Sequence, residues 1–311
     1  MDISIIICTY NRCESLRKLL DDLKSLRVPE NTSYEILIVD NNSRDETKAT
    51  VEAVSQDKLG IFKYIYEPRQ GKSFALNTGL NAASGEIVAF TDDDVEIDTG
   101  WLAEIKRAFE QHDCMGIGGR ILPVWQSEVP WWHEEHGPYG LMDAIVKLDF
   151  GEEPCELKTP AWGANMAFRR TAFDKYGQFR EDLGPNPDNL IRGEDSEFWW
   201  RVIRGGEKLI YSPNVLVYHP VEEKRTRQSY FLSWYFDYGR ASMRLEKAPV
   251  GGPYCFGAPR YLFRQLFEGL AKWIFCLTPK RRFYYKLQVY QTAGQVVESR
   301  ARSVAASSSV L

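Results

Sequence analysis

The chain has 311 residues, enough for one large domain with an appendage or for two modest domains. Hydrophobic residues make up 44% and charged residues 26%, as in ordinary globular proteins, and no apolar run reaches the ~18 residues of a membrane span. The six cysteines are scattered and form no C-x-x-C pair, which argues against a cysteine-based metal site. No signal peptide is visible at the N-terminus, so we expect a reducing, cytosolic location.

Charge is distributed unevenly along the chain. Residues 1–220 carry 24 Lys and Arg against 37 Asp and Glu, a balance of −13, whereas residues 221–311 carry 15 against 6, a balance of +9. The two parts are therefore expected to do different jobs, and the basic part suggests an anionic neighbour.

Strand and helix patterns alternate in the first part of the chain. Four short apolar runs predict buried strands, at 3–8, 36–39, 62–66 and 87–90. Helical periodicity and start signals between them predict three helices, over 16–26, 43–55 and 73–83. Asn11 with Glu14, and Ser43 with Glu46, have the spacing of capping boxes. This alternation predicts an α/β fold built on a mostly parallel sheet flanked by helices.

Polar side chains gather where these strands end. In chain order they are Thr9, Tyr10, Asn11 and Arg12, then Asp40, then Arg69 and Lys72, and finally Asp92, Asp93 and Asp94. Because the carboxyl ends of parallel strands share one edge, we expect these side chains to converge. An aromatic ring and a carboxylate can hold a base and ribose, cations can hold phosphate, and crowded carboxylates call for a hard cation, Mg²⁺ or Mn²⁺. This set is typical of a nucleoside-diphosphate site, although Asp40 alone could form a turn and Arg69 alone could be a solvated charge.

Residues 121–165 form an irregular, aromatic segment. It contains Trp125, Trp131, Trp132 and Trp162 together with His133 and His136, and its prolines argue against a continuous helix. Such a long loop could bind a sugar acceptor on its aromatic faces, or its tryptophans could simply pack the loop on the sheet. The two histidines could bind a metal. The stretch 162–168 predicts a strand that returns to the site.

A second group of candidates lies further along the chain. Gly193, Glu194 and Asp195 stand at the predicted start of a helix, where backbone N–H groups favour negative charge. Asp195 could therefore cap the helix, or it could take part in catalysis. His219 ends an apolar strand over 215–218, and a lone histidine at such a place is usually packed or exposed.

In their order along the chain, these motifs resemble those of family 2 glycosyltransferases of the GT-A fold. The matching segments are Ser4-Ile-Ile-Ile-Cys-Thr-Tyr-Asn-Arg12, Ile38-Val-Asp-Asn-Asn-Ser43, Arg69-Gln-Gly-Lys72 with Ala75, Asn77 and Gly79, Thr91-Asp-Asp-Asp94, and Gly193-Glu-Asp-Ser-Glu197. The resemblance covers residues 2–220. It implies transfer of a sugar from a UDP- or GDP-sugar with inversion at the anomeric carbon, in cell-surface polysaccharide or glycolipid synthesis.

The resemblance also implies roles for single residues. Asp92 would contact the nucleoside, Asp94 and His219 would bind the metal, Asp195 would be the catalytic base with Glu194 beside it, and Trp162, Gly163 and Asn165 would lie near donor sugar and acceptor. Residues 1–95 would then be the nucleotide-binding half, and residues 96–220 the acceptor half, of one catalytic domain.

Residues 221–311 form a separate basic, aromatic and helical region with a tail, from Arg300, that we expect to be disordered. Among its cations, Arg227 is the candidate to hold the departing diphosphate. The apolar stretch 261–277 leads to the basic stretch 280–286, which fits a helix lying on the inner face of the cell membrane. The region could instead pack on the catalytic domain or form a homodimer. The expected acceptor is a carbohydrate or lipid-linked sugar, and no nucleic-acid partner is expected.

Other function classes fit less well. No G-x-G-x-x-G follows the first strand and no complete phosphate-binding P-loop is present, which disfavours a dinucleotide oxidoreductase and a P-loop ATPase. A haloacid-dehalogenase-like phosphatase would use Asp92 as its nucleophile, but its aspartate motif normally ends the first strand rather than the fourth. A catalytically inactive nucleotide-sugar-binding module would not need Asp195.

Overall fold

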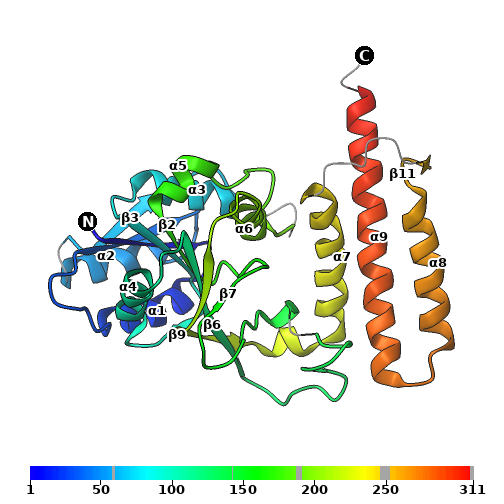
Figure 1. The fold of residues 1–311 in the computed structure, drawn as a ribbon, viewed down its shortest axis with the longest axis horizontal. Coiled ribbons are helices and arrows are strands. Elements are labelled where there is room, and N and C mark those ends of the chain that lie inside the picture. The colour runs from blue at the N-terminus through cyan, green and yellow to red at the C-terminus, as the bar shows by residue number, and fades with distance from the viewer. Residues whose placement is uncertain (58–59, 142, 187–190, 246–252, 309–311) are drawn as a thin grey trace. The chain divides into compact units, whose positions relative to one another are not determined.

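The computed structural model describes residues 1–57, 60–141, 143–186, 191–245 and 253–308. The chain divides into two compact units (Figure 1). The first comprises Met1–Val124, Val146–Asp188 and Glu194–Pro220, and the second comprises Trp125–Ile145, Asn189–Gly193 and Val221–Leu311. The chain passes into the second unit at residue 221, but that unit also takes in Trp125–Ile145, which the sequence analysis had placed in the catalytic domain.

The first unit is built on one large mixed sheet. Its strands are β1 (Ile3–Thr9), β2 (Tyr34–Asp40), β3 (Phe62–Tyr66), β4 (Ile87–Asp92), β5 (Glu96–Ile97), β6 (Gly116–Trp125), β7 (Cys155–Glu156), β8 (Asn165–Arg169) and β9 (Leu209–Val221). They follow the order β3-β2-β1-β4-β8-β6-β9-β5, with β7 paired to β9. The pairs among β1 to β4 are all parallel, whereas β8 joins β4 and β6 antiparallel.

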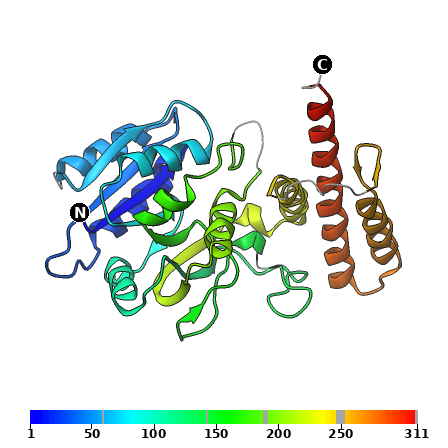
Figure 2. The same cartoon turned by 45° about the horizontal axis from the view of Figure 1, so that its top comes forward.

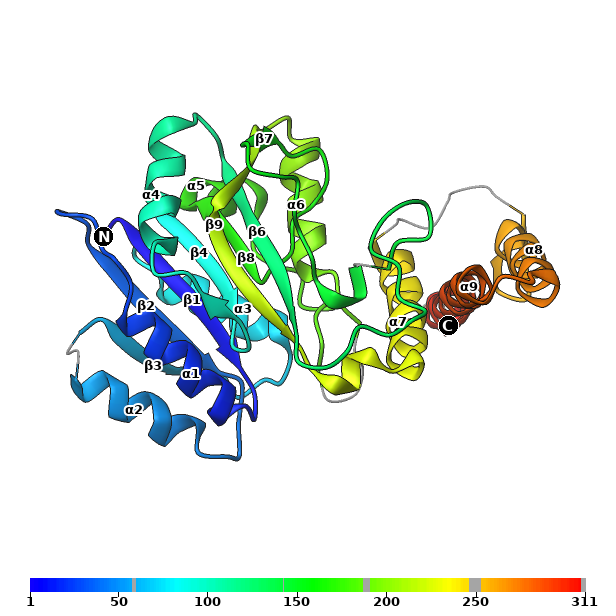
Figure 3. The same ribbon diagram turned by 90° about the horizontal axis from the view of Figure 1, so that it is seen from below.

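Helices cover both faces of this sheet. They are α1 (Cys13–Lys24), α2 (Thr47–Asp57), α3 (Lys72–Ala82), α4 (Trp101–Gln111), α5 (Arg170–Tyr176) and α6 (Glu194–Arg204). Helices α1 and α2 lie on one face of the parallel strands and α3 on the other (Figure 3), as right-handed crossovers require. Four isoleucines of β1 are fully buried because the strand is covered on both sides, which explains its unbroken apolar run. The predicted α/β class is confirmed.

The second unit contains three long helices, α7 (Gln228–Leu245), α8 (Arg260–Phe275) and α9 (Pro279–Ser308). Helix α9 lies between α7 and α8 (Figure 2). Short elements accompany them: the 3₁₀ turns Asp143–Ile145 and Glu223–Thr226, and the strand pair β10 (Tyr254–Cys255) and β11 (Ala258–Pro259). The predicted disordered tail was wrong as far as Ser308, because α9 continues to that residue; residues 309–311 lie outside the described part.

The aromatic loop has a packing role that the sequence left open. The Trp132 ring lies 4.9 Å from the Phe231 ring and 4.7 Å from the Phe283 ring, both in the second unit. His133 is also buried in this cluster. For Trp132 and His133 the packing alternative therefore holds, and neither offers a surface to a sugar or a metal. Within the described ranges, no helix is both long enough and apolar enough to cross a membrane.

Candidate active site

All four of the predicted strand ends lie side by side. In the parallel ladders Thr9 is opposite Asp40, Cys8 is opposite Asp92, and Asp40 is opposite Tyr66. The carboxyl ends of β1, β2, β3 and β4 therefore meet at one edge of the sheet, as predicted.

The loops after β1 and β2 are tied together at this edge. Asn11 has a left-handed backbone with φ 52°, its N–H donates to Ser43 Oγ (2.9 Å), and its Oδ1 accepts from the Arg44 N–H (2.7 Å). The predicted capping box of Asn11 was wrong: α1 begins at Cys13, whose N–H donates to Asp45 Oδ2 (2.9 Å). The predicted capping box of Ser43 was also wrong. Its hydroxyl accepts the hydrogen bond from the Asn11 N–H, and α2 begins four residues later, at Thr47.

Asp40 is almost fully buried and accepts hydrogen bonds from both sides. The Tyr64 hydroxyl donates to Oδ2 (2.7 Å), and the Ser43 N–H donates to Oδ1 (2.9 Å). The turn that Asp40 could form is thus present. Each carboxylate oxygen retains a second lone pair, so ribose binding by Asp40 stays a prediction. Tyr10, with 39% of its surface exposed, remains available to a base.

Arg12 supplies a positive charge to two residues of the aspartate run, Asp93 and Asp94. Arg12 Nη1 lies 3.0 Å from Asp93 Oδ1 and 2.7 Å from Asp94 Oδ2. Burial raises the pKa of Asp93 to about 6; Arg12 opposes this shift and the charge of Asp94 adds to it. Arg12 was predicted to bind the nucleotide, but in this structure its guanidinium holds two carboxylates together.

Asp94 also faces His219 across the edge of the sheet. His219 lies in β9 and is buried, and its Nε2 is 3.9 Å from Asp94 Oδ1. Two ligands at about 2.1 Å from one octahedral ion stand roughly 3–4 Å apart, so this separation fits a shared divalent cation. A carboxylate suits Mg²⁺ or Mn²⁺, and an imidazole nitrogen favours the transition metal. No cluster of three or more His, Cys, Asp or Glu side chains that could hold a metal is found among the residues described.

Lys72 joins the two groups of candidates that the sequence had placed far apart. Its Nζ lies 2.7 Å from Asp92 Oδ1, at the end of β4, and 3.8 Å from Glu194 Oε1, at the start of α6. The charges of these carboxylates raise the pKa of Lys72 although burial acts to lower it. The lysine was predicted to bind the nucleotide, and its contact with Glu194 was not foreseen.

The two carboxylates at the start of α6 have different surroundings. Asp195 Oδ2 accepts from the Gly163 N–H (2.7 Å) and Oδ1 from the Ser196 N–H (2.6 Å). Glu194 is 3% exposed, and its Oε2 has no hydrogen-bond partner within the described chain. Burial, together with the charge of Asp195, raises the pKa of Glu194 to about 7, against the opposing effect of Lys72. The pair therefore contains one oriented carboxylate and one carboxyl group that is protonated in part at neutral pH.

Gly163 is the predicted acceptor residue with the clearest role. A Cβ atom at this position would lie 3.1 Å from Asp195 Oδ2, so the glycine allows its backbone N–H to approach the carboxylate. Trp162, half-buried, donates from Nε1 to the Lys147 carbonyl (3.1 Å). Both remain candidates for the acceptor side of the site.

Asn165 belongs to the framework instead. Its side chain is fully buried, its Oδ1 accepts from Trp101 Nε1 (2.8 Å), and its Nδ2 donates to the Arg120 and Val215 carbonyls (2.9 and 2.8 Å). Both amide hydrogens are used within the protein, and the buried side chain has no surface to offer an acceptor. The predicted contact with the acceptor is therefore corrected to a structural role that joins β8 to its neighbours.

Two residues that sequence reasoning missed shape the loop after β3. Glu67, nearly buried, holds Arg69 through Oε1 to Nε (3.0 Å) and Oε2 to Nη2 (2.7 Å). These bonds lower the pKa of Glu67 to about 2. Asn41 accepts from the Gly71 N–H (2.7 Å) and donates to the Arg69 carbonyl (2.7 Å). The position of Glu67 directly after an apolar strand was a signal that could have been used. Arg69 itself remains 56% exposed and so can still meet a phosphate.

Arg227 lies in the second unit. Its Nη2 is 3.4 Å from Glu223 Oε1, and both side chains are exposed. The diphosphate contact predicted for Arg227 stays a prediction.

The family comparison matches more than half of the chain. The model of the family described as glycosyl transferase family 2 matches residues 4–177. The chain is 24% identical over 253 residues to the glucosyl-dolichyl phosphate glucuronosyltransferase of Haloferax volcanii, which covers 79% of this chain and 78% of that protein. It is 26% identical over 251 residues to the succinoglycan biosynthesis protein ExoM of Rhizobium meliloti, with 80% and 77% covered.

Solved structures share the fold at low sequence identity. The mannosyltransferase PcManGT of Pyrobaculum calidifontis, in complex with GDP-Man and Mn²⁺, is similar with a TM-score of 0.55 and 19% identity, over 99% of this chain and 75% of that one. S. aureus TarS 1-349, in complex with UDP-GlcNAc, is similar with a TM-score of 0.56 and 17% identity, over 97% and 92%. The GT-A type of fold expected from the sequence is confirmed.

Proposed function

Because the chain belongs to glycosyltransferase family 2, we propose that it is an inverting, metal-dependent hexosyltransferase that uses a nucleoside-diphosphate sugar. One observation carries the proposal. Lys72 contacts both Asp92, at the edge expected to hold the donor, and Glu194, beside the expected base. The proposed donor-binding edge and the proposed base for the acceptor would then lie in one site, as sugar transfer requires, and this supports the proposal.

The donor would lie along the edge formed by β1, β2 and β4. Tyr10 and Asp40 would hold the base and ribose, while Asp92 would contact the nucleoside and Arg69 the phosphates. Support for a nucleotide sugar comes from structural relatives, of which one is in complex with GDP-Man and another with UDP-GlcNAc. The choice between UDP and GDP is left to the titration below.

Asp94 and His219 would hold the metal. Their donor atoms, 3.9 Å apart, fit one Mn²⁺ or Mg²⁺ ion. When bound, the ion would offset the charge that develops on the departing nucleoside diphosphate.

Asp195 would act as the base. It would accept the proton of the acceptor hydroxyl while the hydroxyl oxygen bonds to the anomeric carbon and the bond from that carbon to the diphosphate oxygen breaks. A single displacement of this kind inverts the anomeric centre. The N–H groups of Gly163 and Ser196 hydrogen-bond to the two oxygens of this carboxylate and so orient it. Because its pKa is raised, Glu194 carries less negative charge near neutral pH, which reduces its repulsion with Asp195.

For the acceptor, we propose a carbohydrate or lipid-linked sugar in polysaccharide or glycolipid synthesis, on the cytoplasmic side of the cell membrane. The support is again from relatives. One is named as a succinoglycan biosynthesis protein and another as a glucosyltransferase acting on an undecaprenol-linked glycan, 36% identical over 104 residues.

Calorimetric titration with UDP and GDP, each with and without Mn²⁺, tests this proposal. We expect one nucleotide to bind tightly and only when the metal is present. Incubation with the matching nucleotide sugars and a panel of lipid-linked and free glycans should then give a glycosylated product. Binding without any transfer would indicate an inactive nucleotide-sugar-binding module. Binding of neither nucleotide would overturn the proposal.

A further inference from the structure

The end of helix α8 and the turn that follows it expose large apolar side chains. Ile274 is 61% exposed, Phe275 78% and Leu277 95%. Phe267, two turns earlier on the same side of α8, is 70% exposed. An exposed apolar cluster of this kind marks a surface that has a partner. We call these four residues the apolar tip.

The opposite side of α8 is already occupied by α9. Leu262 is fully buried, a Cβ atom on Gly269 would lie 3.1 Å from Val289 Cγ2, and Lys286 Nζ lies 5.5 Å from the centre of the Trp273 ring. Helix α8 therefore has two apolar sides. One packs against α9 within the second unit, and the other, at the apolar tip, is exposed.

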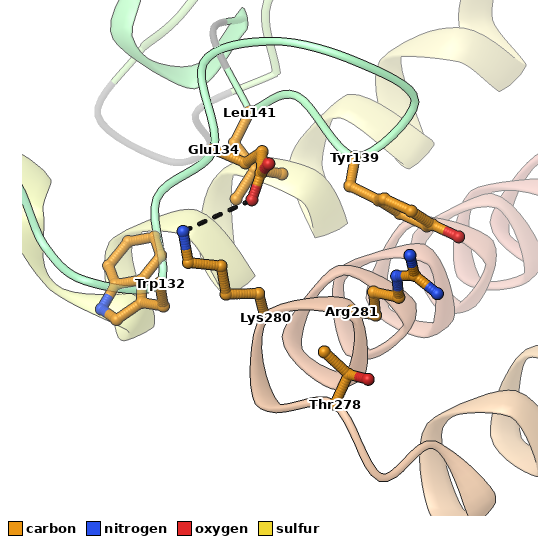
Figure 4. Close-up of a pocket in the computed structure, with 7 residues that line it drawn as sticks. All are labelled: Trp132, Glu134, Tyr139, Leu141, Thr278, Lys280 and Arg281. Atoms are coloured by element: carbon orange, nitrogen blue, oxygen red, sulfur yellow. Dashed lines mark ion pairs between the residues drawn. The ribbon is translucent and has the colours of Figure 1, made fainter.

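Basic residues are frequent in the chain segment that carries the apolar tip. Residues 260–286 contain seven Lys and Arg and a single acidic residue, Glu268. Lys280, Arg281 and Arg282 begin α9 immediately after the turn. The first two line a cavity of about 130 Å³ (Figure 4), where Lys280 Nζ is 3.5 Å from Glu134 Oε2 and the Arg281 guanidinium lies 5.1 Å from the centre of the Tyr139 ring. Glu134 and Tyr139 of the loop thus contact Lys280 and Arg281, which are both still exposed.

We propose that the turn between α8 and α9 docks on an anionic lipid surface. Phe275 and Leu277 enter the boundary between headgroups and acyl chains, and Lys280, Arg281 and Arg282 contact the lipid phosphates. Apolar side chains beside basic ones are the combination that binds such surfaces, with each cation adding to the attraction. This inference does not depend on the proposed transfer reaction.

Charge also distinguishes a lipid surface from a second copy of the chain. In a two-fold dimer the same patch occurs on both sides, so Lys280, Arg281 and Arg282 of one copy would lie near the same residues of the other. An anionic membrane would neutralise these charges, whereas self-association through this face would bring like charges together, and they repel one another.

Sedimentation of the full chain with lipid vesicles tests the proposal. We expect strong binding when about a third of the lipid is phosphatidylglycerol, little binding to pure phosphatidylcholine, and release by high salt. The double variant Phe275→Ser, Leu277→Ser should bind the anionic vesicles at least about tenfold more weakly. Arg282→Glu should weaken binding by about tenfold or more because it reverses a charge at the surface.

The matched control is Val297→Ser, which removes an apolar side chain that is 48% exposed on α9 away from the tip and should bind as the unchanged protein does. Circular dichroism and thermal unfolding verify that the variants fold. Equal binding to neutral and anionic vesicles, or unchanged binding of the double variant, would overturn the proposal. A dimer in light scattering that dissociates in the double variant would assign the face to a second copy instead.

Discussion

Lys72 shows most directly how the candidate site balances its charges. It sits between Asp92 and Glu194, while Arg12 takes the corresponding place between the other members of the aspartate run. Buried carboxylates this close would repel one another without these cations. A divalent ion bound at Asp94 would add a further positive charge where the diphosphate leaves.

Replacement of the proposed base provides the first residue-scale prediction. Asp195→Asn keeps the shape of the side chain and one of its two contacts with backbone N–H groups, because only the amide oxygen can accept, and it cannot take up the proton. We expect nucleotide binding within about twofold of the unchanged protein, and a turnover number lower by about 10² to 10⁴-fold. Calorimetry and a product assay measure the two quantities.

The matched control for that variant is Asp21→Asn, an identical chemical change at an exposed position of α1. It should leave both quantities unchanged. Near-normal turnover of Asp195→Asn would show that another group is the base.

Glu194 provides a prediction about stability and pH. Its pKa is raised in the fold from 4.5 to about 7, so the folded protein binds more protons than the unfolded chain between these values. The contribution of Glu194 to the free energy of unfolding therefore falls as the pH rises through this window, by on the order of 3 kcal/mol. Glu194→Gln removes the buried charge. Its melting temperature should rise relative to the unchanged protein between about pH 5 and about pH 8.

Glu35 is the control with the opposite sign. Burial would raise its pKa, but hydrogen bonds from Lys63, Ser4 and Ser84 lower it to about 2. Its stabilising contribution is present above 4.5 and is lost as the pH falls toward 2, so Glu35→Gln should destabilise the protein at neutral pH and have less effect in acid. Identical pH profiles for the two variants would contradict both assignments.

At the scale of elements, helices α7 and α9 approach each other through glycines. A Cβ atom on Gly239 would lie 1.9 Å from the Gln291 carbonyl oxygen, and one on Gly294 would lie 2.0 Å from the Phe236 carbonyl oxygen. Both neighbours are backbone atoms and cannot rotate away. We expect Gly239→Ala to lower the free energy of unfolding by about 1–3 kcal/mol or more, as overpacking does, measured by denaturant unfolding.

Gly269→Ala is the matched control on α8. Its new methyl group would meet only Val289 Cγ2, at 3.1 Å, on a flexible side chain. Alanine also favours a helix by about 1 kcal/mol over glycine, so this variant should be neutral or stabilising. Equal destabilisation by the two substitutions would mean that the close approach of α7 and α9 does not depend on Gly239.

At the scale of the whole molecule, ligand binding should stabilise the fold. A nucleotide present with Mn²⁺ at about a hundred times its dissociation constant adds about 2.7 kcal/mol to the free energy of unfolding. We expect a higher melting temperature with UDP or GDP plus Mn²⁺ than with nucleotide alone. In Asp94→Ala the effect of the metal should disappear, while Asp21→Asn should retain it. A metal effect that persists in Asp94→Ala would place the ion elsewhere.

The division of the chain was foreseen only in part. A change from net negative to net positive charge near residue 220 indicated two regions, and the second unit does begin its long run at Val221. Nothing in the sequence indicated that Trp125–Ile145 belongs to that unit. Aromatic residues in a loop bury themselves against whatever apolar surface the fold brings near, and composition alone does not say which surface that is.

The sequence by itself determined the class of fold and the location of the site. Apolar periodicity specifies strands and helices locally, and their alternation leaves few arrangements, so the polar residues after β1, β2 and β4 had to share one edge. Only the tertiary structure decided the partners: the contact of Lys72 with Glu194, the antiparallel insertion of β8, and the burial of Asn165. These depend on strand register and packing between distant segments, which no local pattern records.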